Sequence, residues 1–584
     1  MDTRRLILFV IFSFSIVMLW EAWQKQQIAL HAPPVAQSAP NAAPGPASVP
    51  QPGSPAGVPA PTAPNAAPNA VPVPAGTAVP AAATPAPTAA EAVVKTDMVT
   101  ARINSVGGSI DYLSLVHHKD SDDQTRDFVL FGTHGYAAQS GLVGSPALPT
   151  HLTPFTLAPG DYELKPGQNQ VQVRLEANAG GVKVAKIYTF HRGSYVIDLD
   201  YQITNGSGAP LSPSAYLQLT HDAKPLPGDT RFMHTFTGPA FYTDRDKFKK
   251  DDFSDIEKGK PLKLEPADDG WVALVQHYFT SAWLPQGTVK REFYTRKVAE
   301  DLYSAGVFLP VGTIAPGATG KLDAKLFAGP QEVDALEAAA PHLERVKDYG
   351  MLDIIARLMY QALVWLHGYI GNWGLSIIAL TIIIKAIFFP LSAASYKSMA
   401  RMKKVTPKMT ALREKYANDR AKMNQAMMEL YKTEKINPLG GCLPVVIQIP
   451  VFISLYYALL STVELRHAPF YGWITDLSKP DTLFGILPVL GGLPVGLLPI
   501  LMAASMFLQT RMNPAPPDPV QARMMMFMPL VFSALFFFFP SGLVLYYVVN
   551  NLLSIAQQYS ISRVMAEKEP GSGKPKAAND AKKK

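Results

Sequence analysis

The chain has 584 residues, of which 48% are hydrophobic and only 17% are charged. It is therefore richer in apolar residues and poorer in charge than an ordinary soluble protein, which indicates residence in a membrane. The formal net charge of +7 is modest for this length, so the positions of Lys and Arg matter more than their total. The single cysteine, Cys442, excludes an intrachain disulfide and argues against redox chemistry.

The first predicted element, residues 1–25, is a transmembrane helix at the N-terminus. Arg4 and Arg5 precede an apolar run from Leu6 to Trp20, and Trp23 follows where an interfacial aromatic belt is expected. No small-x-small cleavage site follows directly. An uncleaved signal anchor with a cytoplasmic N-terminus is therefore favoured over a removed signal peptide.

Residues 26–92 have the composition of a tether. From Pro33 to Ala90 there is no charged residue, and Pro and Ala dominate the segment. Such a composition cannot bury a core, because it offers few large apolar side chains, and it predicts an extended, partly polyproline II linker.

Residues 93–335 show the short alternating pattern of β-strands. "VQVRLEA" from Val171 places every second residue on one apolar face, and "YVIDLDYQIT" from Tyr195 does the same opposite Asp198 and Asp200. Glycine and asparagine separate the runs, as in "NGSG" from Asn205. The segment predicts one large antiparallel β-sandwich, which lies outside the cytoplasm because it follows an anchor whose N-terminus is inside.

The rest of the chain is predicted to be helical. Residues 336–370 read as connecting and amphipathic interfacial helices, residues 371–560 as a five-helix core, and residues 561–584 as a basic tail. With the anchor, the core spans make six transmembrane helices. The apolar runs of the core are Gly371–Leu391, Leu443–Leu460, Leu483–Leu508 and Met524–Gln558, the last being two spans joined at "FPSGL".

The charges of the loops test this topology. Between Leu391 and Gly440 there are eleven Lys or Arg against four Asp or Glu, whereas Val463 to Thr482 has two against three. The positive-inside rule makes the first loop cytoplasmic and the second external. Six spans starting inside also place the C-terminus in the cytoplasm.

The cytoplasmic loop predicts a helical hairpin over residues 395–434. Thr406 fits a helix cap with Pro407 at the first helical position, and the pattern breaks near residues 417–419. Its basic residues either solvate the hairpin or dock an anionic partner such as ribosomal RNA or lipid head groups. The candidate docking residues are Arg413, Lys415 and Arg420.

Lys385 lies inside the apolar run "TIIIKAIFFP", where a cation costs about 2.5–3.5 kcal/mol at a helix centre. No Asp or Glu occurs in the core spans to pair with it. Its amine either snorkels to the cytoplasmic surface or lies in a wet recess, which is the favoured interpretation. Thr381 shares its helix face, and other spans supply polar groups: Gln448, Ser505, Gln509, Asn550, Asn551 and Ser554.

Three stretches resemble the Oxa/Alb/YidC family of membrane protein insertases in its Gram-negative form. They are "GNWGLSIIALTIIIKAIFFPL" from Gly371, "INPLGGCLPVVIQIPVFISLYYAL" from Ile436 and "FPSGLVLYYVVNNLLSIAQQ" from Phe539. The resemblance implies an inner-membrane protein with a periplasmic β-supersandwich and a hydrophilic groove open to cytoplasm and lipid. It places Lys385, Thr381, Gln448 and Tyr547 in that groove, and we add Asn551 and Gln509. The implied partners are nascent membrane proteins, the Sec translocon, the ribosome and membrane lipids.

Two features depart from the family. The best-known members carry arginine where this chain has Lys385, which keeps the charge but loses the planar five-donor fork. The fourth core span, from Leu483, is longer and richer in proline and glycine. The lysine therefore argues against bidentate capture of a carboxylate, whereas point-charge attraction survives. The expected mode of action is binding without covalent chemistry, cofactor, metal or small-molecule substrate.

Other functions fit less well. A proton-coupled transporter normally needs carboxylates in its spans, and the tail fragment "GSGKP" from Gly571 lacks the upstream glycine of a nucleotide-binding loop. A carbohydrate-active external domain is the other alternative, because related sandwich folds bind carbohydrate. Its candidate bases, none of which forms a distinctive pair by spacing, are His117, His118, His191, His221, His234 and His277.

Overall fold

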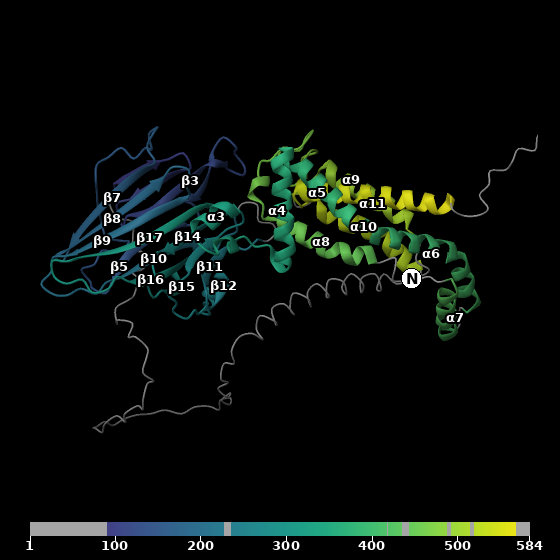
Figure 1. Cartoon of the computed structure of the whole chain (residues 1–584), viewed down its shortest axis with the longest axis horizontal. Coiled ribbons are helices and arrows are strands. Elements are labelled where there is room, and N and C mark those ends of the chain that lie inside the picture. The colour runs from purple at the N-terminus through teal and green to yellow at the C-terminus, as the bar shows by residue number, and fades with distance from the viewer. Residues whose placement is uncertain are drawn as a thin grey trace, which may run out of the picture. The chain divides into compact units, whose positions relative to one another are not determined.

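The computed structural model describes residues 90–226, 235–416, 419–434, 443–487, 492–513 and 519–567. The predicted signal anchor, nearly all of the predicted tether and most of the basic tail lie outside these residues, as does His234. Within them, a β-rich part runs from β1 to β17 and a helical part follows it along the chain (Figure 1).

The β-rich part contains two large antiparallel sheets. The eight-stranded sheet has the order β1-β2-β3-β5-β10-β16-β15, with β4 paired to β3. In that order the strands are Glu91–Lys95, Val99–Asn104, Ser109–Lys119, Ala137–Val143, Ser214–Asp222, Leu302–Pro310 and Glu292–Ala299, and β4 is Asp127–Phe131.

The nine-stranded sheet has the order β12-β11-β13-β14-β17-β9-β8-β7-β6. These strands are Lys247–Lys250, Gly238–Thr243, Trp271–Val275, Phe279–Pro285, Thr319–Pro330, Val196–Asn205, Val182–His191, Gln170–Ala179 and Thr156–Leu157. One short helix, α2 (Phe253–Glu257), lies between β12 and β13 in the chain.

The two sheets share one hydrophobic core, so the predicted antiparallel sandwich is confirmed. Along β7 the side chains of Val171, Val173 and Leu175 are buried, and along β9 Ile197 and Leu199 are buried while their neighbours are half-exposed. These are the faces that the alternation predicts, because a period of two puts alternate side chains on opposite sides of a sheet.

A connector of short helices leads out of the sandwich. It comprises α3 (Val333–Ala339), the 3-10 turns η1 (Leu343–Val346) and η2 (Gly350–Leu352), and α4 (Asp353–Ile370). The exposed fractions of Ile354, Leu358, Trp365 and Tyr369 on α4 are 85%, 64%, 60% and 77%. Their spacing puts this apolar surface on one helix face, as an amphipathic helix requires.

Among the residues that the structure describes, seven further helices form the rest of the helical part. Most pack around a second core, separate from that of the sandwich. They are α5 (Trp373–Ile387), α6 (Phe389–Lys415), α7 (Arg420–Thr433), α8 (Leu443–Leu460), α9 (Leu497–Met512), α10 (Pro519–Phe536) and α11 (Ser541–Glu567). Between α8 and α9 lie the short turn η4 (Val463–Leu465) and a two-stranded hairpin of β18 (Ile486–Leu487) and β19 (Leu493–Pro494).

By length and composition, none of the described helices qualifies on its own as a membrane crossing. α5 and α6, joined across a bend of 66°, qualify as a pair. The number of transmembrane helices therefore remains a prediction.

Two predicted spans differ from the helices that the structure shows. The run Gly371–Leu391 is divided at Phe388, because Pro390 lacks an amide hydrogen and its ring crowds the preceding turn. The fourth core helix begins at Leu497 instead of Leu483, since the preceding residues pair as the β18–β19 hairpin.

The hairpin helix begins at Phe389, ahead of the predicted start of the hairpin at residue 395 and of the cap at Thr406. Pro407 lies inside α6, and the Thr406 hydroxyl donates to the carbonyl of Met402 at 3.1 Å as a mid-helix threonine does. Thr406 and Pro407 therefore mark no helix start in this chain.

Candidate functional site

Lys385 lies in the last turn of α5. This helix begins at Asn372, whose side-chain oxygen accepts a hydrogen bond from the amide of Leu375 at 3.0 Å. It ends at Ile387, just before the bend into α6. A cation in the last turn of a helix is stabilised by the partial negative charge of the unpaired carbonyls there.

The Lys385 amine bridges two other helices. It donates to the Ser554 hydroxyl on α11 at 2.8 Å and to the side-chain oxygen of Gln448 on α8 at 3.4 Å. Gln448 in turn donates from its amide nitrogen to the Tyr546 hydroxyl at 2.8 Å. Polar side chains of α5, α8 and α11 thus form one connected network.

α11 contributes a polar face to this network. Asn550, Asn551 and Ser554 are buried, and Tyr546 lies four residues before Asn550, on the same face. The Asn551 amide donates to the Ser505 hydroxyl at 3.1 Å, a separate contact that joins α11 to α9.

Tyr546 was missed by the sequence prediction, which chose Tyr547. Tyr547 lies instead among aromatic rings, with its centroid 4.7 Å from those of both Phe452 and Phe536. The spacing of four residues from Tyr546 to Asn550 and again to Ser554 was the signal that could have identified it.

The other predicted site residues have different surroundings. Thr381 is buried, and its hydroxyl donates to the carbonyl of Ile377 in its own helix at 2.7 Å, so it makes no direct bond to Lys385. Gln509 is half-buried on α9, one turn beyond Ser505. The close contacts of Lys385 are therefore Ser554 and Gln448.

The charge of Lys385 is not neutralised by a neighbour in the described residues. Both of its hydrogen-bond acceptors are neutral oxygens, and no described carboxylate forms an ion pair with it. Hydroxyl and amide oxygens satisfy the donors of an ammonium group but leave its net charge intact. The site can therefore attract an incoming anionic group.

α6 and α7 carry the predicted docking residues. Arg413 and Lys415 lie in the last turn of α6, and Arg420 is the first residue of α7. The two helices share a small apolar core, and Lys408 forms an ion pair with Glu434 at 2.6 Å. Arg413 and Lys415 therefore lie at the end of α6, and Arg420 lies at the start of α7.

The histidines of the sandwich have structural surroundings. His221 is fully buried and hydrogen-bonds to the Gln276 amide at 3.0 Å, and His191 pairs with Asp198 at 2.7 Å on the adjacent strand. The ring of His118 packs edge-on against Phe279. Across the described ranges no three His, Cys, Asp or Glu side chains cluster as metal ligands do.

Comparisons with known proteins cover both the β-rich part and the helical part of the chain. The family model of the YidC periplasmic domain matches residues 91–362, and that of the 60Kd inner membrane protein matches residues 365–569. The membrane protein insertase YidC of Aromatoleum aromaticum is 53% identical over 98% of this chain and 100% of its own length. That of Cupriavidus necator is 52% identical over 100% of both chains.

This chain belongs to the YidC family of membrane protein insertases. A solved structure described as an active YidC insertase with its first transmembrane domain resolved aligns at 19% identity, covering 80% of this chain and 92% of that chain, with a TM-score of 0.36. Members of the family are inner-membrane insertases with a periplasmic domain, and they are not enzymes. Strands β1–β17 lie within the match to that periplasmic domain.

Proposed function

We propose that this protein inserts nascent membrane proteins into the inner membrane, as its relatives' name states for them. The observation that carries the proposed mechanism is the ammonium of Lys385, which within the described residues is hydrogen-bonded to neutral groups of α8 and α11 and to no carboxylate. A polar segment of a substrate enters from the cytoplasm, and Lys385 lowers the free energy of an acidic side chain partway across.

The apolar part of the substrate then leaves into lipid along the helices. Its transfer from water provides the driving force, at about 0.8 kcal/mol for each buried CH₂. No nucleotide or covalent intermediate is required, because binding energy alone moves the chain. The groove of this mechanism is lined by Lys385, Thr381, Gln448, Tyr547, Asn551 and Gln509, together with Tyr546 and Ser554.

The proposed topology has six spans with both termini in the cytoplasm and the sandwich in the periplasm. It rests on the charge asymmetry of the loops and on the apolar runs of the sequence. α4 then lies in the outer interface with its exposed apolar face toward lipid. The domain limits are residues 1–25, 26–92, 93–335, 336–370, 371–560 and 561–584.

The α6–α7 hairpin is proposed as the docking surface of the cytoplasmic side. Arg413 and Lys415 lie at the end of α6 and Arg420 at the start of α7, so they present a local positive charge to an anionic partner. The ribosome and the Sec translocon are the proposed partners in delivery, and membrane lipids surround the core.

Site-specific photocrosslinking tests the groove. Photoreactive residues at Gln448 and Tyr546 should crosslink to a ribosome-stalled nascent membrane protein, because Gln448 contacts Lys385 and Tyr546 contacts Gln448. The same probe at Lys258, next to α2 in the sandwich, is the matched control. Equal crosslinking at all three positions would contradict a substrate path through the network.

A further inference from the structure

The first part of the connection from α8 to α9, residues 461–482, contributes to both large hydrophobic cores, and we call it the α8–α9 loop. Val463 is buried in the core of the β-sandwich. Leu465 and Leu477 are buried in the core of the helical part. One short loop thus packs into two cores, and its position depends on both.

Arg466 in this loop forms hydrogen bonds to the β-sandwich. Its guanidinium donates to the carbonyl of Lys119 at 2.6 Å and to the hydroxyl of Ser121 at 2.7 Å. The same group lies over the stacked rings of Phe128 and Phe279, at 5.1 and 5.4 Å from their centroids. The planar fork of arginine suits two acceptors on neighbouring residues, and the rings shield it from water.

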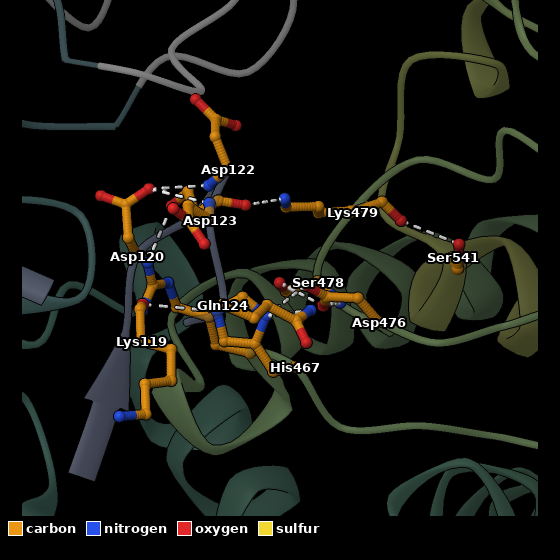
Figure 2. Close-up of polar contacts among 12 residues, drawn as sticks. Lys119, Asp120, Asp122, Asp123, Gln124, His467, Asp476, Ser478, Lys479 and Ser541 are labelled. Carbon is orange, nitrogen blue, oxygen red and sulfur yellow. Dashed lines mark hydrogen bonds and ion pairs between the residues drawn. The ribbon is translucent and has the colours of Figure 1, made fainter. Parts of the chain in front are cut away.

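Ser121 lies on the turn between β3 and β4, residues 120–126, and Lys119 is the last residue of β3. Figure 2 draws the polar contacts of this turn. The carboxylate of Asp120 accepts hydrogen bonds from the amides of Asp122 and Asp123 at 2.8 and 3.2 Å. Asp123 accepts from Thr125 at 2.6 Å and from Arg126 at 2.8 Å. The turn therefore keeps its shape through its own side chains, as Asx turns do.

Lys479 connects this turn to the start of α11, as Figure 2 shows. Its amine donates to the carbonyl of Ser121, while its own carbonyl accepts from the amide and the hydroxyl of Ser541, both at 2.8 Å. The carbonyl of Leu477 accepts from the amide of Gly542 at 2.9 Å. The first amides of a helix have no partner within the helix, so this loop satisfies them and fixes the helix end.

The sandwich also holds the last residue of α8. His277 hydrogen-bonds through Nε2 to the carbonyl of Leu460 at 2.9 Å. Burial lowers the pKa of His277 to about 4, so the ring is neutral at neutral pH and donates from Nε2. The sandwich therefore restrains the neighbouring ends of the two helices that carry the partners of Lys385.

We infer that the β domain braces the helical core, and that Arg466 and Lys479 are positioning residues that set the relation of α8 to α11. This inference rests on the proposed function of the Lys385 network. Ser554 lies thirteen residues beyond Ser541, about 20 Å along α11, so a tilt of about 3° at the helix start moves Ser554 by about 1 Å. A shift of that size lengthens a hydrogen bond of 2.8 Å beyond its useful range.

The brace can be broken from either side. Arg466→Ala and Lys479→Ala remove the donors of the α8–α9 loop. The double variant Asp120→Ala, Asp123→Ala loosens the β3–β4 turn and leaves every residue of the helical core unchanged. Lys258→Ala, at the end of α2 and outside these contacts, is the matched control for loss of a lysine.

The measurement is the distance between spin labels at Ile449→Cys on α8 and Leu552→Cys on α11, in full-length protein with Cys442→Ser in lipid nanodiscs. Both side chains are exposed, so the labels disturb little packing. We expect each brace variant to broaden the distance distribution and to slow insertion of the acidic-tailed substrate by roughly tenfold, because Lys385 is then displaced from its partners. Lys258→Ala should match the parent.

Two results would overturn the brace. One is an unchanged distance distribution in all brace variants, even if the insertion rate or the melting temperature falls. That result would mean that the contacts stabilise the fold without setting the relation of α8 to α11. The other is equal broadening in Lys258→Ala. The Lys385→Ala variant separates this inference from the proposed function, since it should keep the parental distances and lose mainly the acidic-tailed substrate.

Discussion

Replacing Lys385 tests whether its charge assists the substrate. The structure places its amine against the neutral oxygens of Ser554 and Gln448, so an arriving carboxylate meets a positive charge that no described residue has neutralised. We expect Lys385→Arg to retain insertion, and Lys385→Ala to impair substrates with an acidic translocated segment far more than neutral ones.

The size of the effect follows from Coulomb's law. A carboxylate at about 4 Å from the ammonium gains about 4 kcal/mol at an effective dielectric constant of about 20. Water in the recess screens the pair further and leaves roughly 2 kcal/mol. A barrier raised by that amount slows insertion about 30-fold. A neutral segment gains no such attraction, so its rate should change little.

The assay compares acidic-tailed and neutral-tailed versions of one substrate, inserted into proteoliposomes that contain each variant at equal protein level. Lys385→Leu is the informative control, because a lysine that only snorkels to the surface contributes nothing to insertion. A leucine variant that matches the parent on both tails would refute the role of this residue. Equal loss on both tails would mean that Lys385 keeps the recess hydrated and does not attract the carboxylate.

Three further predictions concern other parts of the protein. Reversing the charges of Arg413, Lys415 and Arg420 should slow substrate delivery in a salt-sensitive way, whereas an unchanged rate at low salt would mean a merely solvated hairpin. Asp481→Ala should lower the free energy of unfolding by about 2 kcal/mol, because this buried carboxylate accepts from the Leu498 amide at 2.8 Å at the start of α9, and Asp481→Asn should recover most of the melting temperature. Acid should unfold the sandwich between about pH 6.5 and pH 4, measured by its loss of ellipticity, because protons bind the unfolded chain first and each histidine withdraws up to about 3 kcal/mol. The histidines whose pKa is lowered to about 4, chiefly by burial, are His118, His151, His221 and His277.

Much of the sandwich could be predicted because its signal is local. Alternation along β7 and β9 gives the buried face residue by residue, and the structure confirms it. The order of the strands within each sheet could not be predicted from local patterns, because strands that pair, such as β10 and β16, are far apart in the sequence. The burial of Lys186 was also not predicted from the sequence. Its side chain is fully buried, and its amine donates to the carbonyl of Ser140 at 2.8 Å.

At two helix boundaries an apolar or helical pattern in the sequence conflicts with the position of a proline. The run before Pro390 reads as one apolar span, yet the proline ends α5 at Ile387. Pro407 reads as a helix start, yet α6 continues through it, since the chain upstream is already helical. Local propensity cannot decide between these outcomes, because packing against other helices contributes more than propensity does.

The site itself was predicted by residue type and refined by geometry. Lys385 and Gln448 were identified from charge and polarity in an apolar run, and the structure joins them. Tyr547 was named from the resemblance to the family. Which of Tyr546 and Tyr547 faces Gln448 depends on the rotation of α11 about its axis, which a single run of apolar residues leaves undefined.

The neutral surroundings of Lys385 suit a protein that must both attract and release its substrate. A permanent carboxylate partner would cancel the charge, and an arriving segment would first have to displace it. The hydroxyl of Ser554 and the amide of Gln448 satisfy the ammonium without neutralising it, and each is replaced by water or substrate at little cost. Because these two partners lie on different helices, the charge stays available only while α8 and α11 keep their spacing, which is what the contacts of Arg466 and Lys479 with the sandwich maintain.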